Sequence, residues 1–307
     1  MWRKRSRGFR LRILGLLALL VAGMGWMVYA PVRQERLNRA LIVAIKHNDT
    51  QAVLALLAKG ADPNARDEPL QHFFFWRLLL DKLQGKRPIP STAPTALLLA
   101  CYWNENHTKS PDNTILVKGL VDRGAALEEK DHSAGRTPLL CAVESDKTEV
   151  STLLIERGAN INASDKGGHT PLMLAAQNNN KRLVRLLLDR GADVNAIGYI
   201  GRAYRIAYSP LMMAQEAKED DPAITEMLLS GGAKVNGPDT LTALDYAIFK
   251  KRRRSVRILL QHGADVNLQY VRGYTPLMLA ESVGDKQIIR MLKQAGAKEK
   301  EGNRVSP

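Results

Sequence analysis

Few residues of this sequence stand in patterns that could perform chemistry. The chain has no His-Glu-x-x-His, no paired Cys-x-x-Cys, no Gly-Lys-Ser/Thr phosphate loop and no Gly-x-Ser-x-Gly elbow. The six histidines are scattered one by one, and we interpret them as structural or solvent-exposed. The acidic run Glu219-Asp220-Asp221 falls in a predicted turn, where solvation or helix capping explains it better than acid–base catalysis. We therefore expect no enzyme activity, no cofactor and no bound metal.

Positive charge is the second chemical feature of the chain. The formal net charge is +14, and a group of basic residues precedes position 13. The densest basic run elsewhere is Lys250-Lys251-Arg252-Arg253-Arg254. This run is either a solvated turn or a contact for an acidic partner or anionic lipid. A nucleic-acid partner is not expected, because no recognisable reading module accompanies the basic residues.

The elements that must position any site follow from an internal repeat. The pattern Thr-Pro-Leu-x-x-Ala occurs at Thr137–Ala142, Thr170–Ala175 and Thr275–Ala280, and a glycine follows each Thr after 21 residues. Degenerate copies begin at Thr95, Ser209 and Thr242. Gly-Ala pairs close the repeat units at Gly60, Gly124, Gly158, Gly191, Gly232, Gly263 and Gly296.

Each part of this repeat has a local structural role. The Thr hydroxyl can cap a helix, and Pro fits the first helical turn, where its missing N–H is no loss. An apolar run such as Leu183–Leu188 predicts a second helix, and Gly191 suits the left-handed residue that ends it. Because one helix pair cannot bury its apolar face alone, neighbouring units are expected to stack.

This repeat resembles that of the ankyrin-repeat family. The resemblance covers roughly residues 36–297 and implies an all-α solenoid of about seven helix–turn–helix units with hairpin fingers. The first unit has Arg39-Ala40-Leu41 in place of Thr-Pro-Leu and is predicted to be an atypical cap, while residues 298–307 form a polar tail. The units are expected to end near Asn64, Leu127, Asn162, Asn195, Asn236, Asn267 and Ala297.

Three departures interrupt the repeat. The insertion at about residues 65–94 contains the apolar cluster Phe73–Leu80, which is expected to be buried against the array, at a membrane surface or in a partner. The insertion at 197–208 is rich in Tyr and Arg and predicts a longer finger. A smaller expansion, at 104–113, falls between the two helices of the second unit.

The two cysteines, Cys101 and Cys141, fall on the first helices of neighbouring units. Equivalent positions of stacked units are expected to lie beyond the distance that a disulfide can bridge. We predict two buried free thiols, with a disulfide as the alternative.

The N-terminus predicts a membrane anchor. A basic tail, residues 1–12, precedes the uncharged residues 13–30, which as a helix would span about 27 Å, and residues 31–35 are predicted as a linker. Basic flanks stay in the cytoplasm, so the repeats are predicted to lie across the membrane. The bacterial inner membrane, with the repeats in the periplasm, is the favoured location, and a eukaryotic secretory membrane is the alternative. A cleaved signal sequence ending at Ala30 would also export the repeats.

The ankyrin resemblance also implies where a partner would bind, namely at the residue before each capping Thr and at the end of each first helix. We therefore expect a membrane-tethered module that binds an unidentified protein through the concave face and fingers. The alternative is an inhibitor or immunity-type protein that neutralises an exported enzyme or toxin, whose partner would be acidic. The predicted contact residues are Tyr102, Trp103, Arg136, Glu144, His169, Gln177, Asn178, Tyr208, Phe249, Lys250 and Tyr274.

Overall fold

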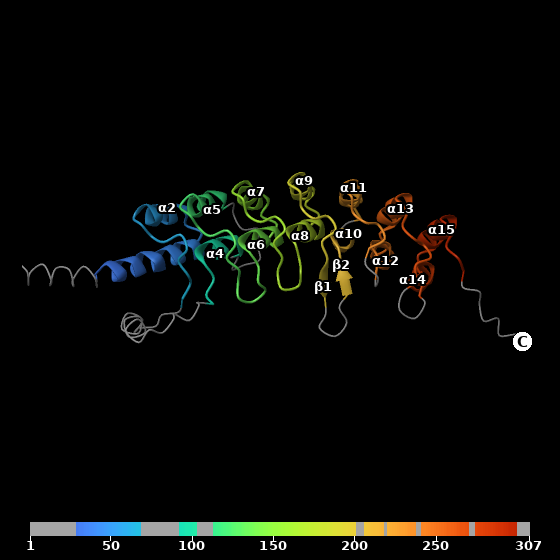
Figure 1. Cartoon of the computed structure of the whole chain (residues 1–307), viewed down its shortest axis with the longest axis horizontal. Helices are drawn as coiled ribbons and strands as arrows, with labels where there is room; N and C mark the ends of the chain where they lie inside the picture. The colour runs from blue at the N-terminus through green and yellow to red at the C-terminus, as the bar shows by residue number, and fades with distance from the viewer. Residues whose placement is uncertain are drawn as a thin grey trace, which may run out of the picture. The chain divides into compact units, whose positions relative to one another are not determined.

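The structure is a computed structural model (Figure 1) that describes residues 29–68, 92–102, 113–200, 206–217, 220–237, 241–269 and 274–299. Among the helices of these residues, none has the length and apolar character that a membrane span requires. Several predicted features lie wholly or mostly outside the described residues: the basic tail 1–12, the membrane segment 13–30, the cluster Phe73–Leu80, Trp103 and the expansion 104–113.

Paired helices make up most of the described residues, as the repeat predicted. A helix over residues 29–46 precedes α2 (Thr50–Ala58), and α4 (Ala96–Tyr102) and α5 (Thr114–Val121) follow. The next pairs are α6 (Pro138–Glu144) with α7 (Thr148–Glu156) and α8 (Pro171–Gln177) with α9 (Lys181–Asp189). Strands β1 (Gly198–Ile200) and β2 (Ile206–Tyr208) precede α10 (Pro210–Met213), η1 (Ala214–Glu216) and α11 (Ala223–Ser230). The last pairs are α12 (Ala243–Phe249) with α13 (Arg253–Gln261) and α14 (Pro276–Val283) with α15 (Lys286–Gln294).

The chain divides into two compact parts, residues 1–100 with 115–125 and residues 101–114 with 126–307. In the first part, the helix over residues 29–46 contributes Leu41 to the core, and the 31–35 segment predicted as a linker belongs to this helix. The helix therefore continues through residues 31–35, where the sequence analysis predicted a linker.

Polar side chains of this N-terminal helix bind the loop that closes the first repeat unit. Gln34 Nε2 donates to the carbonyl of Gly60 at 2.9 Å, and Asn38 Oδ1 accepts the N–H of Asp62 at 2.9 Å. These are the loop groups that a preceding repeat unit would otherwise bind. The helix thus acts as the predicted atypical cap.

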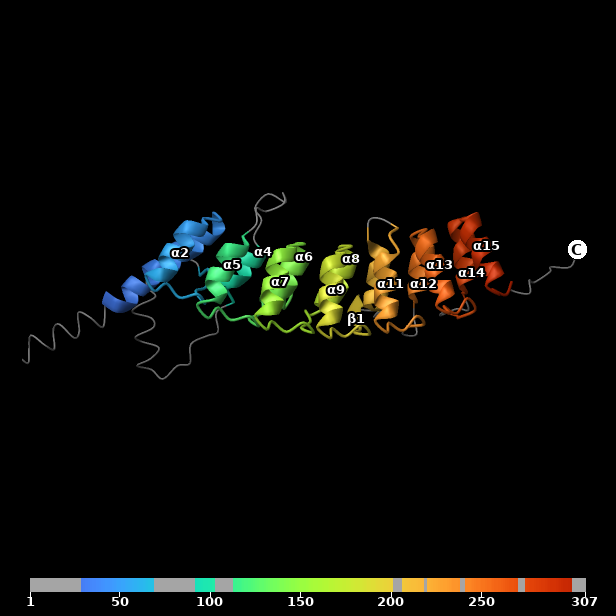
Figure 2. The same cartoon turned by 90° about the horizontal axis from the view of Figure 1, so that it is seen from above.

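In the second compact part, the helices form two layers (Figures 1 and 2). The first helices α6, α8, α10, α12 and α14 pack in sequence in one layer, and the second helices α7, α9, α11, α13 and α15 pack in the other. The Leu of each Thr-x-Leu or Ser-x-Leu motif points into the core between them. These leucines, Leu139, Leu172, Leu211, Leu244 and Leu277, are each at most 2% exposed.

The repeated Thr and Gly have the local roles that their types predicted. At the start of each first helix in this part, the Thr or Ser side-chain oxygen accepts a hydrogen bond from the backbone N–H three residues later, at 3.3 to 3.4 Å. Gly191, which ends a second helix, has a φ of 80°, a conformation that favours glycine.

The Asn that closes a repeat unit bonds the closing loop of the next unit. Asn195 Nδ2 donates to the carbonyl of Gly232 at 3.1 Å, and its Oδ1 accepts the N–H of Lys234 at 2.8 Å. Asn236 and Asn267 repeat both bonds one and two units later. This ladder explains why Asn recurs at the end of the units.

The insertion at 197–208 forms the predicted longer finger. Strands β1 and β2 pair antiparallel, with Gly198 opposite Tyr208, so the described residues also contain one small sheet besides the predicted helices. The two cysteines are buried and free, as predicted.

Candidate partner-binding surface

The predicted contact residues that the structure describes lie just before a first helix or at the end of that helix. We call the surface that these positions make on α6, α8, α12 and α14 the first-helix surface. Phe249, the last residue of α12, is 62% exposed, and Tyr274, just before α14, is 54% exposed. Because α12 packs against α14, these two aromatic rings come from adjacent repeat units. Their exposed area is available to a partner.

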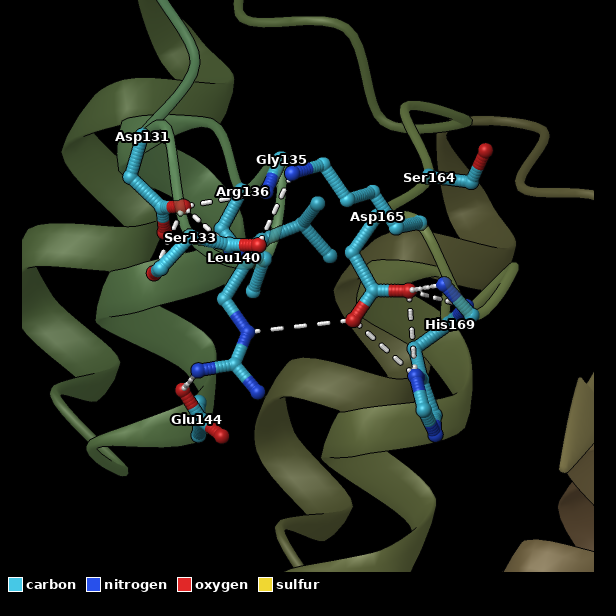
Figure 3. A network of polar contacts seen from close by, with 12 residues as sticks. Asp131, Ser133, Gly135, Arg136, Leu140, Glu144, Ser164, Asp165 and His169 are labelled. Carbon is cyan, nitrogen blue, oxygen red and sulfur yellow. Dashed lines mark hydrogen bonds and ion pairs between the residues drawn. The ribbon is translucent and has the colours of Figure 1, made fainter. Parts of the chain in front are cut away.

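A polar network joins the units of α6 and α8 at this surface (Figure 3). Arg136 Nη1 lies 2.6 Å from Glu144 Oε2, and Arg136 Nε lies 3.7 Å from Asp165 Oδ2. Asp165 lies 3.0 Å from His169 Nδ1 and accepts the backbone N–H groups of His169 and Gly167. The guanidinium is therefore held between carboxylates of two successive units, and the Arg136 side chain as a whole is 23% exposed.

Burial and hydrogen bonding act differently on the two carboxylates of this network. Burial alone would raise the pKa of Asp165, but the hydrogen bonds from His169 and Gly167 outweigh burial and hold this pKa below its ordinary value. Burial raises the pKa of Glu144, and the nearby Arg136 opposes this rise only in part. Asp165 is thus the firmly ionised anchor of Arg136.

Other predicted contact residues also connect neighbouring repeat units. Lys250 Nζ lies 2.9 Å from a Glu216 carboxylate oxygen and 5.9 Å from the centre of the Phe249 ring. Asn178 Nδ2 donates to the carbonyl of Val143 at 2.8 Å. These side chains therefore stabilise the stack as well as forming part of its surface.

The structure corrects the prediction for Tyr208. This residue is 2% exposed, its ring centre lies 5.0 Å from that of His169, and its hydroxyl donates to the carbonyl of Gly167 at 3.2 Å. Pairing of β2 with β1 places Gly198 opposite Tyr208, and the missing side chain of Gly198 leaves room for the ring. Tyr208 therefore supports His169 from within the finger. Tyr102 and Gln177 are exposed.

Sequence reasoning did not identify the partners of three acidic residues, Asp165, Glu216 and Asp220. Asp165 lies five residues before the capping Thr170, in a turn whose Gly167 and Gly168 could have signalled a bound side chain. Glu216 pairs with Lys250, and Asp220 accepts the backbone N–H of Arg254 at 2.9 Å across two repeat units. The last two contacts join residues more than 30 positions apart and left no local signal.

The exposed aromatic rings and the held guanidinium can bind apolar and polar groups of another molecule, and no described group of acidic, His and Cys side chains could hold a metal ion. Layered helix pairs with fingers and such a surface define a repeat-type protein-interaction module. Two family models match the chain, "Ankyrin repeats (3 copies)" at residues 97–197 and "Ankyrin repeat" at residues 37–68, 239–270 and 272–300. Together they cover more than half of the chain, which belongs to the ankyrin-repeat family.

Two known proteins illustrate this relationship. The "Putative ankyrin repeat protein L271" of Acanthamoeba polyphaga mimivirus is 32% identical over 89 residues, which make up 28% of this chain and 12% of that protein. The ankyrin-repeat domain of Bcl-3, described as a unique member of the IkappaB protein family, is 25% identical in sequence with a TM-score of 0.56. That match covers 83% of this chain and 97% of the Bcl-3 chain.

Proposed function

We propose that this ankyrin array binds a partner protein through its first-helix surface. The observation that carries the proposal is the exposure of Phe249 and Tyr274 on adjacent units, together with Lys250, which follows Phe249 and is already fixed by its ion pair with Glu216. Aromatic side chains supply most of the energy of many interfaces, and side chains that are ordered before binding lose little entropy on binding.

Arg136 is the polar counterpart of these rings in the proposal. Its guanidinium is oriented by Glu144 and Asp165 before any partner arrives, and it can still donate hydrogen bonds from its exposed edge. We expect a partner that offers carbonyl or carboxylate oxygens to Arg136 and apolar surface to the aromatic residues.

We further propose that residues 13–30 tether the array to a membrane and that the array lies on the extracytoplasmic side, most simply in a bacterial periplasm. The support is the uncharged sequence of these residues and the basic tail before them. A phosphatase fused after Pro307 should be active, and the full chain should stay in the membrane fraction after a carbonate wash. Activity of a cytoplasmic reporter alone would refute this topology, and a shorter soluble species would indicate cleavage.

The inhibitor alternative would need a strongly basic first-helix surface facing an acidic enzyme or toxin. The described residues do not favour it, because Arg136 and Lys250 are each matched by a glutamate of the array. We therefore place the general interaction module first.

In-cell photocrosslinking tests the binding proposal. A photoreactive residue is placed at Phe249, at Tyr274 or, as the control, at the exposed Glu156 that ends α7 in the other helix layer. We expect one and the same protein to be captured from Phe249 and Tyr274 and not from Glu156. Substituting Arg136→Ala in the crosslinking proteins should reduce this capture. Equal capture from all three positions, or none from Phe249 and Tyr274, would contradict the proposal.

A further inference from the structure

A groove with basic walls lies between α13 and α15. These two helices belong to the layer of second helices, opposite the layer of first helices (Figures 1 and 2). Its volume is about 500 Å³, and a second hollow of about 390 Å³ adjoins it, since both share Gln287 and Arg290 as walls. We call the two together the α13–α15 groove. The apolar residues Leu260, Met291 and Ala295 also line the groove.

The charge of this groove is strongly one-sided. Its walls carry one carboxylate, Asp285, which is buried and pairs with Arg253 at 2.8 Å. Neither α13 nor α15 contains an acidic residue. Four exposed basic residues of the walls make no ion pair with a described residue: Lys251, Arg257, Lys286 and Arg290.

Apart from the pair of Arg253 with Asp285, this arrangement of charges opposes helix stability. Arg253 and Arg257 are four residues apart on α13, as are Lys286 and Arg290 on α15, and like charges at this spacing destabilise a helix. Lys286 is also the first residue of α15, where positive charge opposes the helix dipole, whereas the charge of Arg253 at the start of α13 is already matched by Asp285. An anionic ligand would offset both effects.

The groove walls also indicate the kind of anion. Arginine donates paired hydrogen bonds that match a carboxylate or a phosphate equally well. The walls add Gln261, Gln287 and Gln294, whose amides both donate and accept, and a peptide backbone supplies both kinds of partner. The apolar lining residues Leu260, Met291 and Ala295 suit an apolar side chain.

We propose that the α13–α15 groove binds an acidic segment of a protein in which carboxylate side chains flank an apolar side chain. This site is separate from the first-helix surface and does not depend on the function proposed for that surface.

A peptide array tests the proposal with the full-length protein as the probe. The array carries short peptides in which the residues around a central Leu vary, together with copies in which Lys replaces each acidic residue and Gly replaces Leu. We expect retention of peptides with Asp or Glu on both sides of Leu, and loss of binding when either feature is replaced. Retained peptides without acidic residues, or no retained peptide, would overturn the proposal.

The affinity of the best retained peptide is then compared between two charge-reversed proteins. Arg257→Glu with Arg290→Glu removes the groove charge, whereas Arg185→Glu with Arg190→Glu makes the same change of net charge at exposed positions of α9 and its end. We expect the groove variant to bind about tenfold more weakly or worse, because charge-assisted hydrogen bonds are lost, and the control to bind nearly as well as the natural protein.

A milder variant and a lipid-binding measurement accompany this comparison. If the reversed groove variant is unfolded by circular dichroism, the milder Arg257→Gln with Arg290→Gln replaces it, and weaker peptide binding is still expected. Equal weakening by the groove and α9 variants would overturn the proposal, because it would show a response to net charge alone. Binding to phosphatidylserine vesicles that the groove variant loses, without binding of acidic peptides, would also overturn it in favour of a lipid site.

Discussion

A buried carboxylate in α12 should contribute less to the stability of the array at neutral pH than at mildly acidic pH. Asp245 is 0% exposed and stands where the other repeat units have an apolar residue, such as Met173 or Met212. Its Oδ2 accepts the N–H and hydroxyl of Thr242 at 2.8 and 2.6 Å, but its Oδ1 has no hydrogen bond to a described residue. Burial raises the pKa of Asp245 from 3.8 to about 6, although the bonds from Thr242 oppose this rise.

The direction and size of the effect follow from these two pKa values. Between pH 3.8 and about 6, folded Asp245 holds its proton while the unfolded chain releases it, so stability falls as the pH rises through this window. Below the window the full stability is present. Above it the cost of the buried charge is complete, and a difference of about two pKa units corresponds to about 3 kcal/mol.

Asp245→Asn tests this reasoning, since the amide oxygen can still accept both bonds from Thr242 while the side chain carries no charge. We expect the variant to gain up to about 3 kcal/mol in free energy of unfolding at pH about 7 and little at pH about 4. Urea unfolding of the full-length protein across this range measures the difference, and amide exchange in α12 localises it.

A second buried carboxylate provides the matched control. Burial would raise the pKa of Asp285, but hydrogen bonds from Arg253, Ile288 and Gln287 hold it below its ordinary value. Asp285→Asn should therefore destabilise the protein at neutral pH, opposite to Asp245→Asn. If the natural protein and Asp245→Asn show the same pH dependence of stability, the charge of Asp245 carries no burial cost and the argument fails.

Three further predictions concern the turns, the ladder and the thiols. Gly168→Ala should lower the free energy of unfolding in urea by at least about 1 kcal/mol more than Gly191→Ala does. Both glycines have a positive φ, but only at Gly168 would an added Cβ meet backbone, at 2.8 Å from the Cα of Gly198. Equal costs would contradict this close approach. Asn195→Ala should lower the free energy of unfolding by about 1 to 2 kcal/mol, because two hydrogen bonds between units are lost. Asn195→Asp should lower it by less, because the carboxylate can still accept the N–H of Lys234. A greater loss for Asn195→Asp than for Asn195→Ala would argue against the ladder. Burial raises the pKa of Cys101 to about 12 and raises the pKa of Cys141 further. Neither thiol should therefore react with iodoacetamide at pH about 8 until urea unfolds the chain. Rapid labelling of the folded protein would contradict the burial of the thiols.

The sequence was sufficient to predict the helix pairs, their caps and their closures. These features depend on local chemistry, since the Thr170 hydroxyl bonds an N–H three residues away and Gly191 adopts its conformation within its own turn. Because each repeat unit packs on units of the same pattern, local signals repeated along the chain also predicted the stacking. The finger at 197–208 followed from its extra length alone.

Tertiary structure decided which side chains are buried, paired or exposed. Tyr208 is of a residue type that is common in interfaces, yet strand pairing and the small Gly198 place its side chain inside the finger. Asp245 stands at a capping position of α12, but its side chain is completely buried in the folded array. Asp220 reaches the start of α13 from a turn more than 30 residues earlier. Burial and charge pairing depend on the register of a neighbouring unit and on side-chain directions across the stack, and no local spacing in the sequence carries that information.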